Sequence, residues 1–155
     1  VVAGRKQPLS YTLYHKNRAP LEVLGHYETA CGGCDTIKTL DQIYELVNSA
    51  HDSGKDVLFE GMLLCSDVKR VVELSKRVEN FFVFSLSTPV EACLENIRKR
   101  RAERGDTKEL AEKNTRTRYE YEKKQVGKLK DAGVKVSYID YKMALDRVQE
   151  EFKCI

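Results

Sequence analysis

The sequence has no apolar run long enough to cross a membrane, and nothing at its start has the form of a secretory signal peptide. Internal repeats, low-complexity tracts and linkers are also missing. The net charge is only +3, which does not by itself require a nucleic-acid partner. With 155 residues, 41% hydrophobic and 33% charged, the chain is predicted to form a single soluble domain with a sizeable core.

A disulfide-stabilised scaffold is a further class that the composition disfavours. The five cysteines are an odd number, spread through a chain of ordinary size: Cys31, Cys34, Cys65, Cys93 and Cys154. Secreted domains that depend on disulfides are usually short and carry paired cysteines. We therefore predict free thiols and a cytoplasmic location.

Hydrophobic patterning predicts strands that alternate with helices. Two β-prone runs, 9–14 and 21–25, flank a turn-forming segment and predict a hairpin near the start. Helices are predicted at 40–51, 68–78, 89–105 and 115–131, with a last amphipathic helix around 145–152. Further strands are predicted at 56–60 and 81–86, both expected to be buried, and at 134–139. Such alternation specifies parallel strands joined by right-handed crossovers. The predicted fold class is therefore α/β, a three-layer parallel sheet with helices on both faces and an N-terminal β-hairpin region.

Two helix starts carry clear capping signals. Thr39 with Gln42 three positions later forms a capping box before an apolar stripe. Thr88, Pro89 and Glu91 combine an N-cap hydroxyl, a proline at the first helical position and a glutamate at the third. We expect helices to begin directly after Thr39 and Thr88.

The central strand is predicted to end in a carboxylate. Asp56-Val57-Leu58-Phe59-Glu60 follows a helix that stops at Gly54, as a buried parallel strand would. Ligands of open α/β sheets bind just beyond the carboxyl ends of the strands, so Glu60 is a candidate site residue. The alternative is an ordinary strand that ends in a solvated glutamate.

A second candidate is the basic end of the helix that follows Thr88. Arg98, Arg101 and Arg104 recur at intervals of three and share roughly one helix face. Guanidinium groups suit bidentate contacts with phosphate oxygens. A solvated helix end, whose cations complement the helix dipole, is the alternative.

Taken together, residues 57–140 resemble the second half of a P-loop nucleotide kinase. The shared features are a strand that ends in an acidic residue (Val57–Glu60), a later strand followed by Thr-Pro, a helix and an arginine-bearing lid (Phe82–Gly105), and a closing strand Gly133–Asp140. At the front, Gly25-His26-Tyr27-Glu28 and Gly33-Cys34-Asp35-Thr36 resemble the acceptor-binding region of small phage-type kinases.

The resemblance implies roles for these residues. Glu60 would hold Mg²⁺, directly or through water, and Arg98, Arg101 and Arg104 would neutralise the transferring phosphates of ATP, with Arg101 counted among the catalytic residues. Asp35 would orient the acceptor hydroxyl or accept its proton, with Tyr27 and Gly33 beside it. From its position alone, the more frequent role of Asp35 would be to cap a helix that begins at Thr36.

The family's phosphate-binding loop, Gly-x-x-x-x-Gly-Lys-Ser/Thr, is missing from these 155 residues. Gly54-Lys55 precedes a strand and Gly127-Lys128 lies within a helical pattern, so neither pair fits. We expect the loop to lie on an N-terminal segment outside this sequence, which begins without methionine. Its strand would stand between the strand that ends at Glu60 and the strand Phe81–Leu86, which should therefore not pair with each other.

The predicted function is ATP-dependent phosphoryl transfer to a hydroxyl of a nucleoside, nucleotide or nucleic acid. One alternative is a kinase-like module that has lost catalysis and binds nucleic acid or a protein partner through its basic groove. Another is a thioredoxin-like dithiol enzyme, because Cys31-Gly32-Gly33-Cys34 precedes a predicted helix.

Overall fold

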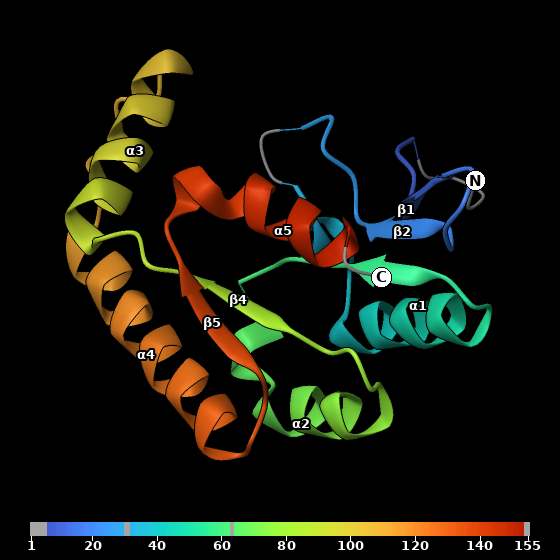
Figure 1. Ribbon diagram of the computed structural model, residues 1–155. Helices are drawn as coiled ribbons and strands as arrows, with labels where there is room; N and C mark the ends of the chain where they lie inside the picture. The colour runs from blue at the N-terminus through green and yellow to red at the C-terminus, as the bar shows by residue number, and fades with distance from the viewer. Residues whose placement is uncertain (1–5, 30–31, 63, 154–155) are drawn as a thin grey trace. The chain divides into compact units, whose positions relative to one another are not determined.

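A computed structural model of the protein describes residues 6–29, 32–62 and 64–153, and has α/β architecture (Figure 1). The chain divides into two compact units, Val1–Asp67 and Val68–Ile155. Among the residues described, no helix combines the length and the apolar character needed to cross a membrane. The α/β class predicted from the sequence is confirmed.

The first unit is built on a three-stranded mixed sheet. Strands β1 (Ser10–Leu13) and β2 (Leu21–Leu24) form the predicted antiparallel hairpin, and β3 (Asp56–Leu58) pairs in parallel with β2. Between β2 and β3 lie the short helix η1 (Cys34–Thr36) and helix α1 (Leu40–Asp52), and η2 (Leu64–Ser66) follows β3. Strand β3 is at the edge of this sheet. It ends at Leu58, two residues before Glu60, whereas the predicted strand extended to Glu60.

Helix α1 begins and ends as its sequence predicts. The Thr39 hydroxyl accepts a hydrogen bond from the Gln42 amide at 3.2 Å, which satisfies one of the unpaired donors of the first turn. Its apolar stripe supplies buried residues to the core, among them Ile43 and Val47, and the helix contacts β2 and β3. Because α1 is fixed against the sheet, the loop before it is held at a defined place.

A buried carboxylate ties the three strands together. Glu22 on β2 is only 8% exposed, and it accepts hydrogen bonds from Lys55 Nζ at 2.7 Å, from Thr12 Oγ1 at 2.6 Å and from the Ser10 hydroxyl. Burial alone would raise the pKa of Glu22, but the hydrogen bonds from Lys55, Ser10 and Thr12 outweigh it and lower the pKa. The ionised form is therefore favoured by folding.

Replacing Glu22 with glutamine is expected to destabilise the protein by about 1–3 kcal/mol at neutral pH, because Lys55 loses its counter-ion. Since the native pKa is lowered, this contribution is present above the ordinary glutamate pKa and is lost as pH falls through the native value. Urea unfolding of both proteins at several pH values measures the difference. Glu45→Gln, an exposed change on α1, is the control, and a pH-independent gap would contradict the assignment.

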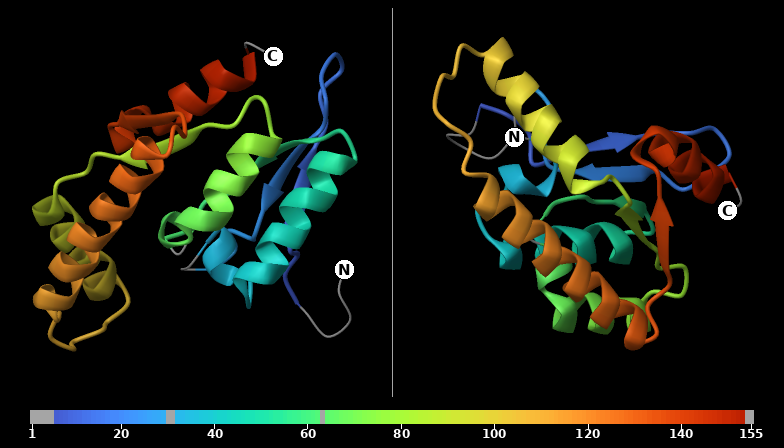
Figure 2. Two further views of the ribbon diagram at one scale, coloured as in Figure 1. Left: turned by 90° about the horizontal axis from the view of Figure 1, so that it is seen from below. Right: turned by 90° about the vertical axis from the view of Figure 1, so that its left-hand side faces the viewer.

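The second unit carries a parallel pair of strands and four helices. Strands β4 (Val83–Leu86) and β5 (Val136–Ile139) pair with each other over four residues. The helices are α2 (Val68–Arg77), α3 (Val90–Glu103), α4 (Glu112–Asp131) and α5 (Ala144–Lys153), with η3 (Tyr141–Met143) before the last. Figure 2 shows α3 and α4 joined by the long loop at 104–111. Helix α4 contacts α2, α3 and β5, so it is the centre of this unit.

The core of this unit is small, which explains several differences from the sequence-based expectations. Val71, Leu129 and Val134 form its buried centre, and Phe81 and Val83 pack against them. Strand β4, predicted to be fully buried, is only partly covered, and Leu86 at its end is 54% exposed. Likewise only Leu94 of the apolar stripe of α3 is buried.

The predicted N-cap at Thr88 is wrong. Pro89 occupies the N-cap position with φ −59° and ψ 145°, and its ring can offer no capping hydrogen bond. Because proline takes the non-helical position, the helix begins one residue later than expected, at Val90. Helix α4 begins three residues earlier than predicted, at Glu112.

Candidate functional site

Two glycines allow the hairpin and the loop before α1 to touch. Gly25 has φ 83°, and a Cβ added there would lie 1.9 Å from the carbonyl oxygen of Gly33. Beside this contact the Gly33 amide donates to the His26 carbonyl at 3.2 Å, so that the two segments form an antiparallel bridge. Only glycine can stand at Gly25, because no side chain fits between the two backbones.

Glu60 is attached to this glycine contact. The Cys34 amide donates to the Glu60 carbonyl at 2.8 Å, which holds the chain beyond β3 against η1. A Cβ on Gly33 would meet the Glu60 carboxylate at 2.1 Å, and Gly33 itself has φ 60°. Gly33 is therefore required here both by its backbone conformation and by the closeness of the Glu60 carboxylate.

Tyr27 and Asp35 complete the group. The Tyr27 hydroxyl and the Glu60 carboxylate are hydrogen-bonded. Asp35 Oδ1 lies 3.2 Å from the place that a Cβ would take on Gly61, the residue next to Glu60. The structure therefore brings together four residues chosen from the sequence, Tyr27, Gly33, Asp35 and Glu60, which come from three separate segments of the first unit.

The electrostatics of the group favour protonation or a cation. Glu60 is exposed overall, but partial desolvation of its carboxylate raises its pKa, and the negative charge of Asp35 raises it further, while the hydrogen bond from Tyr27 opposes the change. Burial, followed by the charge of Glu60, raises the pKa of Tyr27 to about 12. At neutral pH Tyr27 is therefore a hydrogen-bond donor, and within the described residues no basic side chain lowers the pKa of Glu60.

This donor set fits a hydrated magnesium ion. Mg²⁺ usually keeps several waters and binds through one or two carboxylates together with substrate phosphates. Asp35 and Glu60 offer two carboxylates, and the negative charge of Asp35 raises the pKa of Glu60. Within the described ranges no cluster of three or more His, Cys, Asp and Glu side chains is present, so a site made entirely of protein ligands is not found there.

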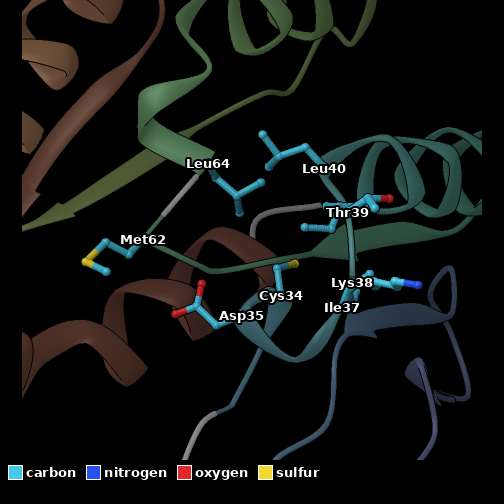
Figure 3. Close-up of a pocket in the computed structure, with 9 residues that line it drawn as sticks. Cys34, Asp35, Ile37, Lys38, Thr39, Leu40, Met62 and Leu64 are labelled. Atoms are coloured by element: carbon cyan, nitrogen blue, oxygen red, sulfur yellow. The ribbon is translucent and has the colours of Figure 1, made fainter. Parts of the chain in front are cut away.

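A cavity of about 250 Å³ opens beside Asp35. Figure 3 shows its wall, which is formed by η1, the start of α1 and the segment after β3. The lining residues are Cys34, Asp35, Ile37, Lys38, Thr39, Leu40, Ile43, Met62 and Leu64. Most of these side chains are apolar, and their sequence pattern gave no sign of a cavity because it is identical to that of core residues.

Cys34 has the wrong environment for a reactive dithiol. The residue is 2% exposed, and burial raises the pKa of its thiol to about 12, with the Glu60 and Asp35 charges acting in the same direction. A hydrogen bond from the Glu60 backbone to the thiol opposes these effects and lowers the pKa, but burial outweighs it. Cys31, the other member of the proposed pair, lies outside the described residues. The dithiol hypothesis gains no support.

The three arginines chosen from the sequence lie at the end of α3, in the second unit. Arg98 forms an ion pair with Glu112, and Arg101 donates to the carbonyl oxygens of Lys108 and Glu109 at 3.1 and 3.3 Å. Arg104 is the exposed residue that follows the helix. Arg98 and Arg101 thus shape the loop between α3 and α4.

Arg116 was missed by the sequence-based selection. Its guanidinium binds Glu91 through both nitrogens, at 2.7 and 2.8 Å, and reaches Glu112 at 3.6 Å. Glu112 and Arg116 are four residues apart on α4, a helical ion-pair spacing that could have identified them. Arg116 therefore joins α3 to α4 on the side of the predicted lid.

The protein has α/β architecture, with a group of acidic side chains just beyond a parallel strand, which is where ligands of this fold class usually bind. No protein-family model and no solved structure matches the chain. Over 150 residues it is 40% identical to a protein named 5-hmdU DNA kinase from Pseudomonas phage PaMx11, covering 96% of this chain and 79% of the phage protein. The chain belongs to the same family as this phage kinase, which supports a phosphotransferase.

Proposed function

We propose that the protein transfers the γ-phosphoryl group of ATP to a hydroxyl group carried by a nucleotide or by DNA. The observation that carries this proposal is the gathering of Asp35, Glu60 and Tyr27 around Gly33, beside a cavity that can hold part of the acceptor. Because the related phage protein is named for 5-hmdU in DNA, the preferred acceptor is the hydroxyl of a hydroxymethyl group on a DNA pyrimidine.

In this proposal Asp35 accepts the proton of the attacking hydroxyl. It borders the cavity, so an acceptor group placed there lies within its reach. Tyr27 holds the Glu60 carboxylate in position by a hydrogen bond. Glu60 would hold Mg²⁺ directly or through water, and the bound ion would supply positive charge against the phosphates.

Arg98, Arg101 and Arg104 are proposed to neutralise the phosphates of ATP, with Arg101 in contact with the transferred group. Arg98 and Arg101 now hold Glu112 and the carbonyls of the following loop, so these contacts must be exchanged for contacts with phosphate oxygens. Positioning and charge stabilisation are most of what phosphoryl transfer asks of a protein.

The proposal requires a phosphate-binding loop, which the 155 residues do not contain. We propose that a segment outside this sequence supplies it, and that its strand completes a three-layer parallel sheet in a single kinase domain acting in the cytoplasm. Within the described residues, β3 is at the edge of its sheet and β4 pairs with β5 alone. Each of these two strands therefore has an edge with which a further strand could pair.

The test is an assay of the full-length protein with radiolabelled ATP and Mg²⁺. The acceptors are duplex DNA that contains 5-hmdU, the same duplex with thymidine, the free nucleosides, and DNA with a 5′-hydroxyl end. We expect label to enter the 5-hmdU duplex and not its thymidine counterpart. Folded protein that labels none of these acceptors would refute the proposed function.

A further inference from the structure

The cavity beside Asp35 has the properties of a pocket for a small, flat, uncharged ring. Ile37, Ile43 and Leu64 are 3–7% exposed and form its inner wall, while Met62 is 53% exposed. Such a wall cannot solvate a phosphate group, because charged groups are costly to bury without partners. The ligand of the cavity itself is therefore apolar over most of its surface.

The size of the cavity limits its ligand further. Its volume of about 250 Å³ is below the ~300–1,000 Å³ of sites that enclose drug-sized molecules. It is also many times the ~30 Å³ share of one water, so it is more than a packing defect. A single nucleobase matches this space, whereas the attached sugar and phosphate would remain outside.

The polar groups of the lining give the pocket a direction. Asp35 places its carboxylate at one side, and Figure 3 shows Lys38 extending away from it. Asp35 Oδ1 lies next to Gly61, and Glu60 precedes that glycine. A ring in the cavity would therefore point one edge toward the carboxylates, and a hydroxyl on that edge would meet Asp35.

We propose that this cavity binds one pyrimidine base that has been rotated out of a DNA duplex, with its hydroxyl-bearing edge toward Asp35. The inference rests on the proposed function and adds the state of the DNA in which the acceptor is recognised. Rotation is not required merely to expose the group, because a substituent at C5 of a pyrimidine already lies in the major groove. The cavity favours rotation of the base, because a base that stays in the duplex and is contacted from the major groove would not reach the apolar wall.

The first measurement follows base unstacking directly. A duplex carries 5-hmdU next to the fluorescent base 2-aminopurine, and full-length protein is added with Mg²⁺ and a non-hydrolysable ATP analogue. Rotation of the target base unstacks its neighbour, so we expect a several-fold rise in fluorescence.

A second measurement compares kcat/KM for 5-hmdU paired with adenine and mispaired with guanine. Extrusion costs less for a mispaired base than for a paired one, so the mispaired substrate should react about ten-fold faster, a difference of about 1.4 kcal/mol.

The matched variants place a tryptophan at two exposed methionines. Met62→Trp places a large ring at the exposed edge of the cavity, and should abolish the fluorescence rise and increase KM for DNA by about ten-fold or more. Met143→Trp changes a methionine of similar exposure, 50%, in η3, and should behave like the unchanged protein. Leu40→Phe narrows the cavity from the side of α1, and is expected to act in the same direction as Met62→Trp.

The outcomes separate this inference from the proposed function. If DNA is phosphorylated but fluorescence does not rise and both base pairs react equally, recognition occurs in the major groove and the pocket assignment is wrong. If no phosphate is transferred, yet fluorescence rises and Met62→Trp removes the rise, the pocket stands and the kinase proposal fails. Equal behaviour of Met62→Trp and Met143→Trp would also overturn the pocket.

Discussion

Gly25→Ala is expected to lower the free energy of unfolding by more than about 4 kcal/mol, a large part of the ~5–15 kcal/mol that is typical of a domain. The added Cβ would lie 1.9 Å from the Gly33 carbonyl oxygen, and the atoms it meets are backbone, which cannot rotate away. The positive φ of 83° adds a conformational cost. Circular dichroism during thermal unfolding measures the result, and we expect the hairpin and the loop before α1 to separate.

The matched control is Gly54→Ala. Gly54 has a similar φ of 75°, but nothing lies within 4 Å of the place its Cβ would take. Only the conformational cost remains, so a loss of about 1–2 kcal/mol is expected. If the two alanine variants unfold at the same temperature, the backbone contact between Gly25 and Gly33 contributes nothing beyond strain.

Glu60→Gln and Asp35→Asn should each lower kcat for phosphoryl transfer by about 100-fold or more, because each removes a negative charge from the proposed active site. The two changes are expected to differ in their magnesium dependence. Glu60→Gln should raise the Mg²⁺ concentration that gives half-maximal rate, whereas Asp35→Asn should lower the rate at every concentration. Titration of activity with Mg²⁺ distinguishes the two roles. The kcat of the double variant should be little lower than that of the less active single variant, because the effects of residues that act as a unit do not add.

If the pKa of Glu60 is raised in the folded protein, unfolding cannot explain the loss of kcat in Glu60→Gln. Partial desolvation and Asp35 raise the pKa of Glu60, so the folded protein binds this proton more tightly than the unfolded chain. Ionisation above that native pKa therefore opposes folding, and an uncharged glutamine removes the penalty. Glu60→Gln should unfold at the same temperature as the unchanged protein at pH 7, or higher. Glu45→Gln on exposed α1 surface should leave rate and stability unchanged, and a slower Glu45→Gln would implicate general charge effects.

Local sequence signals predicted the elements of this protein well wherever a single residue decides the outcome. Thr39 caps α1, Gly54 follows its end and Gly133, with φ 84°, ends α4, as propensity and capping rules require. The prediction failed at Thr88, because the proline beside it took the position that a threonine cap would need. There two local rules competed, and the sequence alone does not say which prevails.

The site was predictable in its chemistry and not in its geometry. The predicted strand end identified Glu60, and the resemblance to small phage-type kinases identified Tyr27, Gly33 and Asp35. The structure places these residues together. The cavity beside them could not have been found, because apolar side chains that line a void have the same periodicity as those that fill a core. Its existence depends on how closely three segments pack, which local patterns do not encode.

If Arg101 binds phosphate as proposed, its present contacts with the α3–α4 loop compete with substrate binding. One guanidinium nitrogen already satisfies the carbonyls of Lys108 and Glu109, so a phosphate that takes this arginine must leave those two acceptors to water. Substrate binding would then be weakened by the free energy of releasing the loop, and the released loop would be more accessible to other molecules, proteases included. In this way one side chain would make the order of a surface loop depend on whether a phosphate is bound.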